Sequence, residues 1–185
     1  MSNSAYIATS LDGYIADQNG GLDWLHSLPN PDQSDFGFAD FMSRVDALVM
    51  GRKTFETVCS FDGPWPYSKP VFVLSRSLAA IPEGYQDKAE WVEGSVHEVV
   101  LSLNERGYRN LYIDGGQTIQ SFLKEDLIDE MIITTLPVLL GGGTPLFGGL
   151  VQPLDFEHRS TEVLLDAMVK SCYVRKRQPV TKVSQ

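Results

Sequence analysis

Three short stretches of the sequence combine glycine, hydroxyl and cationic residues in a pattern suited to phosphate binding: GRKT at 51–54, SR at 75–76 and GGQT at 115–118. Each follows an apolar run typical of a β-strand, and the first and third open a helical pattern. Glycine lets the backbone approach a ligand, and a helix N-terminus offers free N–H groups and a positive dipole end. The first and third stretches therefore predict pyrophosphate-binding turns. Arg76 predicts a site for a further phosphate, such as the 2′-phosphate that separates NADP from NAD.

Each stretch taken alone also fits an ordinary solvated turn, so the interpretation depends on their coincidence. The sequence predicts that they coincide, because strand and helix patterns alternate along the chain. Apolar strand-like runs lie at 4–9, 48–50, 70–75, 110–113 and 130–140, and helical patterns lie between several of them. Such alternation indicates an α/β fold with a mostly parallel sheet and helices on both faces. Ligands of such sheets bind in the crevice beyond the carboxyl ends of the strands.

The remaining segments predict where the fold begins and ends. Segments 156–164 and 167–177 alternate around Leu165-Asp166, which predicts a C-terminal antiparallel hairpin. A first long helix is expected to begin near Ser34 or Asp35. We expect one domain over residues 1–178 and a loose tail over 179–185.

Composition argues against several classes of partner and ligand. The net charge of −9 and pI of about 4.7, without a basic stripe, argue against a nucleic-acid partner. No apolar run has the length needed to span a bilayer, and the N-terminus lacks a signal-peptide pattern, so we expect a cytoplasmic protein and no membrane partner. Cys59 and Cys172 are expected to be free thiols, and no metal-ligand spacing is present.

Other catalytic motifs are absent. The sequence has no G-x-G-x-x-G, no G-x-x-x-x-G-K-[ST] and no G-x-S-x-G. Asp12 and Asp35 are candidate catalytic acids, although aspartates in such positions are more often caps or turn residues. Trp24 and Trp65 fit core or lid packing, and Gly141–Gly143 fits a bulge or bend in a long strand.

Five segments together resemble the dihydrofolate reductase superfamily: SLDGYIA (10–16), LVMGRKTFE (48–56), VLSR (73–76), LYIDGGQTIQSFL (111–123) and TLPVLLGGGTPLF (135–147). The SLDG start and the PVLLGGGTPLF stretch look most like the branch that contains the reductase domain of bacterial riboflavin biosynthesis. The resemblance covers about residues 4–147. It implies a mostly parallel, twisted sheet of about eight strands that binds NADPH and reduces a pterin- or pyrimidine-like ring by hydride transfer.

The resemblance also implies roles for individual residues. The backbone of Ala8 and Ile15 would contact the nicotinamide carboxamide, and residues 19–22 would form a lid over the ring with Trp24 at its base. Asp12, Trp24 and Thr134 would bind the substrate. The expected cofactor-binding residues are Ala8, Ile15, Gly51, Arg52, Lys53, Thr54, Leu74, Ser75, Arg76, Ile113, Gly115, Gly116, Gln117 and Thr118.

One departure from the family concerns the acid that dihydrofolate reductases carry on the first long helix. The corresponding segment here offers Phe38, Phe41 and Met42 inward, and Asp35 lies near its start. The leading hypothesis is therefore an NADPH-dependent reductase of a heterocyclic or ribosylamino substrate, homodimeric by family analogy. A nucleotide-binding protein of the same fold without turnover is the alternative. A phosphoryl-transfer enzyme built on residues 51–54 is a third reading, for which no carboxylate pair is placed.

Overall fold

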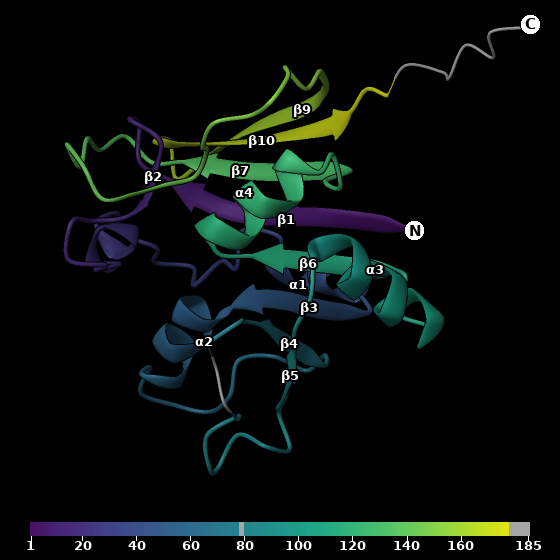
Figure 1. The fold of residues 1–185 in the computed structure, drawn as a ribbon. Helices are drawn as coiled ribbons and strands as arrows, with labels where there is room; N and C mark the ends of the chain where they lie inside the picture. The colour runs from purple at the N-terminus through teal and green to yellow at the C-terminus, as the bar shows by residue number, and fades with distance from the viewer. Residues whose placement is uncertain (78–79, 178–185) are drawn as a thin grey trace, which may run out of the picture.

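The computed structural model describes residues 1–77 and 80–177, and it places eight strands in one sheet. The strand order is β5-β4-β3-β6-β1-β7-β10-β9 (Figure 1). The first six of these strands run parallel, whereas β10 and β9 close the edge as an antiparallel pair. The expected mixed sheet with its C-terminal hairpin is confirmed. The strands are β1 Ser2–Thr9, β3 Ala47–Gly51, β4 Val71–Leu74, β5 Ala89–Val92, β6 Asn110–Asp114, β7 Glu130–Thr135, β9 Phe156–Leu164 and β10 Met168–Arg175.

Helices cover both faces of this sheet. α1 (Phe38–Ser43) and α2 (Arg52–Cys59) pack on one face, and α3 (Val96–Glu105) and α4 (Gly116–Lys124) pack on the other. A 3₁₀ turn, η1 (Asp23–His26), follows the short strand β2 (Tyr14–Ala16), which pairs with β8 (Thr144–Pro145). Within the described residues, no helix is long and apolar enough to cross a bilayer.

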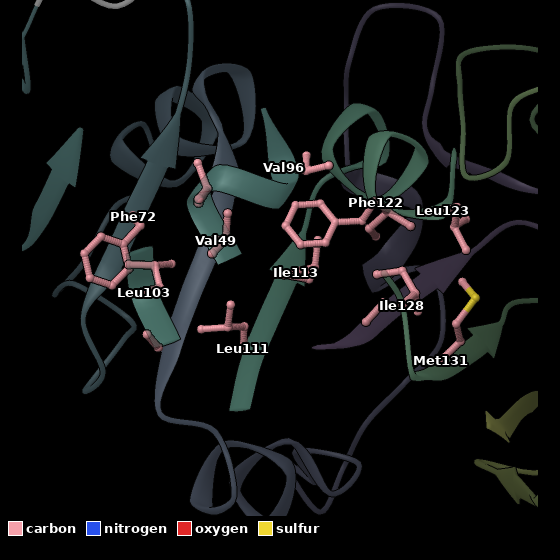
Figure 2. Packing of buried hydrophobic residues seen from close by; sticks show 14 of the residues in the cluster. Val49, Phe72, Val96, Leu103, Leu111, Ile113, Phe122, Leu123, Ile128 and Met131 are labelled. Carbon is pink, nitrogen blue, oxygen red and sulfur yellow. The ribbon is translucent and has the colours of Figure 1, made fainter. Parts of the chain in front are cut away.

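The core is divided by the sheet into two main apolar layers. Figure 2 shows the α3/α4 layer, where Phe122 of α4 and Leu103 of α3 meet Ile113, Leu111 and Val49 of the central strands. These strands are buried on both faces, which explains why their sequences are continuous apolar runs rather than alternating ones. The carboxyl ends of the parallel strands lie together at one end of the sheet, toward the left in Figure 1.

Two expected elements differ from the structure. The first helix begins at Phe38 rather than near Ser34, because Gly37 adopts a left-handed conformation (φ 88°) and the Asp35 carboxylate accepts hydrogen bonds from the N–H groups of Gly37 and Ala39. The long run 130–140 forms a strand only to Thr135, since Pro137 has no N–H to continue the ladder. The expected tail at 179–185 lies outside the described residues.

Candidate functional site

A cavity of about 1700 Å³ opens at the carboxyl ends of β1, β3, β4 and β6. It is larger than the roughly 300–1,000 Å³ of ordinary small-ligand pockets, so it has room for a dinucleotide. All three of the phosphate-type turns reach it. Its lining includes thirteen of the fourteen residues expected at the cofactor: Ala8, Ile15, Gly51, Arg52, Lys53, Thr54, Leu74, Ser75, Arg76, Gly115, Gly116, Gln117 and Thr118.

The fourteenth, Ile113, does not line the cavity. Its side chain is fully buried and belongs to the α3/α4 core layer (Figure 2). Side chains alternate between the two faces of a strand, so the residue that ends β6 at the cavity is Asp114 rather than Ile113. Any ligand contact by Ile113 would have to come from its backbone.

The N-termini of α2 and α4 lie side by side and interlock through two glycine–threonine pairs. A Cβ atom at Gly51, before α2, would come 2.9 Å from Thr118 Oγ1 on α4. A Cβ atom at Gly115, before α4, would overlap Thr54 Oγ1 on α2. Gly115 also has φ +87°, a conformation that side-chain-bearing residues rarely adopt. Position 115 therefore requires glycine, and a side chain at Gly51 would force Thr118 to move. Two helix N-termini with free N–H groups reach the same cavity.

Cationic side chains line the same cavity, although the chain as a whole is acidic. Lys53, Arg76 and Lys124 line the cavity, and within residues 1–77 and 80–177 their side chains have no hydrogen-bond or ion-pair partner. Arg52 makes only a long, solvent-exposed contact with Glu56, at 3.7 Å. Free cations beside helix N-termini favour a ligand with several negative charges. The donor set thus fits a diphosphate-containing cofactor.

Asp114 is a functional candidate that the sequence interpretation did not select. Asp114 lines the cavity although the residue is only 8% exposed, and burial of its carboxyl group raises its pKa to about 6. The Gly115 N–H and the hydroxyls of Tyr112 and Tyr67 act in the opposite direction, because they stabilise the charged form. A carboxyl group with such a pKa can hold or release a proton near neutral pH. Its position directly before Gly115-Gly116, at the end of a buried strand, was the available signal.

The two aspartates selected as candidate acids stabilise loops and do not line the cavity. Asp12 accepts hydrogen bonds from the Ser10 hydroxyl (2.6 Å) and from the N–H groups of Leu140 (3.1 Å) and Gly141 (2.8 Å), which lower its pKa. Asp35 caps the start of α1, and its backbone hydrogen bonds likewise lower its pKa. Both are ionised at neutral pH and tied to backbone donors, so neither is placed to act as a proton donor.

Trp24 and Thr134, expected at the substrate, also lie outside the cavity lining. Trp24 is 9% exposed and packs with Leu136 and Met168, and Thr134 is 7% exposed. Ala8, which does line the cavity, packs against the same cluster, so the two regions are neighbours. The structure therefore separates the expected site into an open cavity and a filled compartment beside it.

The expected lid contributes to the open cavity. Asn19, Gly20 and Leu22 line it together with Asp17, whose Oδ1 accepts hydrogen bonds from the N–H groups of Asn19 and Gly21. The loop at Gly141–Gly143 lies against the same segment, since a Cβ atom at Gly143 would overlap the carbonyl oxygen of Ala16. These contacts position the lid segment over the cavity.

Comparison with known proteins gives the family. This chain is 36% identical to the uncharacterized protein YwjB of Bacillus subtilis, and the match covers 92% of this chain and 95% of YwjB. A Shewanella sp. PV-4 crystal structure named for riboflavin biosynthesis is 58% identical, with a TM-score of 0.94 over 96% of this chain and all of that chain.

More distant solved structures share the fold. A dihydrofolate reductase of Enterococcus faecalis complexed with NADP(H) is 19% identical, with a TM-score of 0.68 over 95% of this chain and 97% of that one. A Thermotoga maritima diaminohydroxyphosphoribosylaminopyrimidine deaminase/5-amino-6-(5-phosphoribosylamino)uracil reductase is 17% identical, with a TM-score of 0.73, and this chain covers 56% of it. The RibD C-terminal domain family model matches residues 4–169, so the chain belongs to the RibD C-terminal domain family, within the dihydrofolate reductase-like fold.

Proposed function

We propose that this protein is an NADPH-dependent reductase that transfers a hydride to a pterin-, pyrimidine- or related heterocyclic or ribosylamino substrate of riboflavin- or folate-type metabolism. The observation that carries the proposal is the pair of interlocked helix N-termini, at Gly51 and Gly115, in one cavity with cations that have no partner in the described part of the chain. Membership of the RibD C-terminal domain family supports a reductase. We further propose a cytoplasmic homodimer.

The chain's own residues would bind and orient the cofactor. The helical N–H groups after Gly51 and Gly115, with Lys53, would hold the pyrophosphate. Arg76 and Ser75, at the end of β4, would hold the 2′-phosphate of the adenosine, and the backbone of Ala8 and Ile15 would orient the nicotinamide. When bound, NADPH would supply the hydride, and the protein would contribute orientation and exclusion of water.

Asp114 would supply the proton in this proposal. It is a carboxyl group at the cavity wall with a pKa of about 6, whereas Asp12 and Asp35 are held ionised by backbone donors. Its hydrogen bond from the Gly115 N–H (2.8 Å) helps to fix the orientation of the carboxyl group. The role that dihydrofolate reductases give to an acid on the first helix would thus fall to a residue on β6.

The test is a titration with NADPH and with NADH, followed by nicotinamide fluorescence. We expect the wild type to bind NADPH more tightly than NADH, and Arg76→Ala to weaken NADPH binding by about tenfold or more, since one charge-assisted contact with a phosphate is lost. Binding of NADH should change little. Arg159→Ala, which removes an exposed arginine on β9 outside the cavity, is the matched control. Failure of the wild type to bind either nucleotide would refute the reductase proposal.

The alternative, a nucleotide-binding protein without turnover, is favoured by one observation: the compartment beside Ala8 is filled by Trp24 and its apolar neighbours. NADPH that binds tightly but is not oxidised with any pterin or pyrimidine substrate would support that alternative. Oxidation of NADPH with one of them would exclude it.

A further inference from the structure

The filled compartment lies over a row of residues that crosses three strands. Ala8 on β1 pairs with Thr134 on β7, which pairs with Lys170 on β10, so their side chains share one face of the sheet. Ala8 also lines the open cavity, whereas Thr134 and Lys170 do not. The row therefore leads from the cofactor cavity into a region that side chains occupy in this structure.

One buried polar group in this region is available to a water or a ligand. The Nε1–H of Trp24 is buried and has no hydrogen-bond partner among the described residues. A buried donor without an acceptor is costly, and native proteins rarely keep one unless a water or ligand satisfies it. Trp24 belongs to the cluster against which Ala8 and Phe36 pack, so this donor lies in the region beside the row.

Residues 33–37 cover the outer end of the row, and two donors hold them there. The carbonyl oxygen of Phe36 accepts hydrogen bonds from Tyr6 Oη (2.9 Å) and from Lys170 Nζ (2.8 Å). Lys170 is 20% exposed in its side chain and also pairs with Glu162 (2.8 Å). Burial raises the pKa of Tyr6 to about 12, so its hydroxyl remains a donor across the physiological range. A single backbone carbonyl thus occupies both donors.

The covering segment is held in an unfavourable backbone conformation. Gln33 (φ 49°), Phe36 (φ 56°) and Gly37 (φ 88°) all adopt left-handed values, and two of these three residues carry side chains. Such conformations persist only where surrounding contacts enforce them. Here the enforcing contacts are the hydrogen bonds to the Phe36 carbonyl and the Asp35 cap. Losing them would allow the segment to relax outward.

We propose that residues 33–37 form a gate over the substrate compartment, and that opening it frees Tyr6 Oη and Lys170 Nζ to bind an oxygen acceptor of the substrate. The compartment would then present Trp24 Nε1–H, the Thr134 hydroxyl, Tyr6 Oη and Lys170 Nζ together. Three donors on the sheet and one on η1 suit a heterocycle that carries ring carbonyl or phosphate oxygens. The proposal rests on the reductase function proposed above, because it gives that site its substrate side.

Hydrogen exchange tests the gate without any ligand. In Lys170→Met, which keeps the length of the side chain but removes the donor, we expect amides 33–39 to exchange at least tenfold faster than in the wild type. Amides of β6 should be unchanged. Lys88→Met is the matched control, because Lys88 Nζ also contacts a loop carbonyl, that of Gly84, far from the gate. Equal exchange at 33–39 in Lys170→Met and the wild type would overturn the gate.

Binding tests the substrate contact. The probes are 7,8-dihydrofolate and 5-amino-6-(5-phosphoribosylamino)uracil, each added to protein saturated with NADPH. We expect at least one to bind, and Lys170→Met and Tyr6→Phe each to weaken it tenfold or more while the NADPH affinity stays within twofold of the wild type. Unchanged probe affinity in both variants, or binding of neither probe to the wild type, would overturn the assignment. Failure of NADPH itself to bind would refute the proposed function, and the exchange experiment would still decide the gate.

Discussion

The two halves of the site differ in how far they are ready for a ligand. The proposed cofactor half is an open cavity that two helix N-termini reach, with cations that have no partner within residues 1–77 and 80–177. The substrate half is closed: its indole is 9% exposed, and a backbone carbonyl occupies the donors of Tyr6 and Lys170. Rigid elements build the first half, namely two strands that each turn directly into a helix. A loop with left-handed residues closes the second.

This difference fits what each half would recognise in the proposed function. A pyrophosphate carries fixed charge, and backbone N–H groups held by helices bind it without rearrangement. A buried compartment without its ligand must instead be filled, because an empty apolar cavity costs packing energy. The comparison predicts that damage to the cofactor half will appear as lost folding and lost nucleotide binding. Damage to the substrate half should appear as changed loop dynamics.

The largest expected effect comes from Gly115→Ala. The new methyl group would overlap Thr54 Oγ1 while the backbone kept φ +87°. Overpacking and the left-handed conformation together should lower the free energy of unfolding by about 3 to 4 kcal/mol. They should also abolish NADPH binding, because the two helix N-termini are forced apart. Urea denaturation and fluorescence titration measure the two effects.

Gly107→Ala is the matched control for that substitution. Gly107 also has positive φ (+95°), but a Cβ atom there meets nothing within 4 Å. Gly107→Ala should therefore lower the free energy of unfolding by only about 1 to 2 kcal/mol, the cost of a left-handed backbone conformation, and should leave NADPH binding intact. Adding Thr54→Ala to Gly115→Ala should recover part of the lost stability. If Gly115→Ala is no worse than Gly107→Ala, the two helix ends are not interlocked.

Asp114→Asn should separate two effects of the Asp114 carboxyl group: the cost of its burial to folding stability and its contribution to turnover. The pKa of Asp114 is raised from 3.8 to about 6, so the folded state binds the proton more tightly than the unfolded state does. The carboxyl group therefore imposes no charge-burial cost below pH 4, and a cost that grows as pH rises through 6 to roughly 3 kcal/mol. Asn should make the protein more stable at pH 8 but not at pH 4.

The same variant should lose turnover while it gains stability. Urea denaturation at pH 4, 6 and 8 measures the first effect, and NADPH oxidation with a bound substrate measures the second. Asp46→Asn is the control, because Asp46 is a carboxylate whose pKa is lowered by the N–H groups of Arg109 and Asn110, far from the cavity. The Asp46→Asn variant should be less stable than the wild type at pH 8, because it loses a carboxylate that the fold stabilises in its charged form. Equal pH dependence in Asp114→Asn and the wild type would show that Asp114 does not titrate as a buried acid.

The sequence was sufficient to predict which turns meet at the open cavity. Alternating strand and helix patterns require a mostly parallel sheet, and parallel strands end at a common edge, so the turns at Gly51, Arg76 and Gly115 had to meet. Both the fold and the family resemblance are confirmed. Local patterns succeed here because each turn is formed by residues adjacent in the chain.

The substrate half could not be predicted in the same way, because it is made by contacts between distant segments. The carbonyl of Phe36, for example, accepts a hydrogen bond from Lys170 Nζ across 134 residues. The start of the first helix shifted for a related reason, since the left-handed Gly37 and the Asp35 cap delay it. No periodicity in the sequence encodes those pairings.

The smallest expected effect tests whether the cofactor half is rigid. Ser95 caps α3: its hydroxyl accepts from Glu98 N–H, and the Glu98 carboxylate accepts from Ser95 N–H at 2.7 Å. Ser95 and the next residues also line the far end of the cavity. Ser95→Ala should lower the free energy of unfolding by about 1 kcal/mol. If the cavity is preformed by the sheet and helix packing, NADPH affinity should stay within twofold. A tenfold loss of affinity would instead show that this helix start adjusts to the cofactor, and that the cofactor half resembles the gated half more than its open shape indicates.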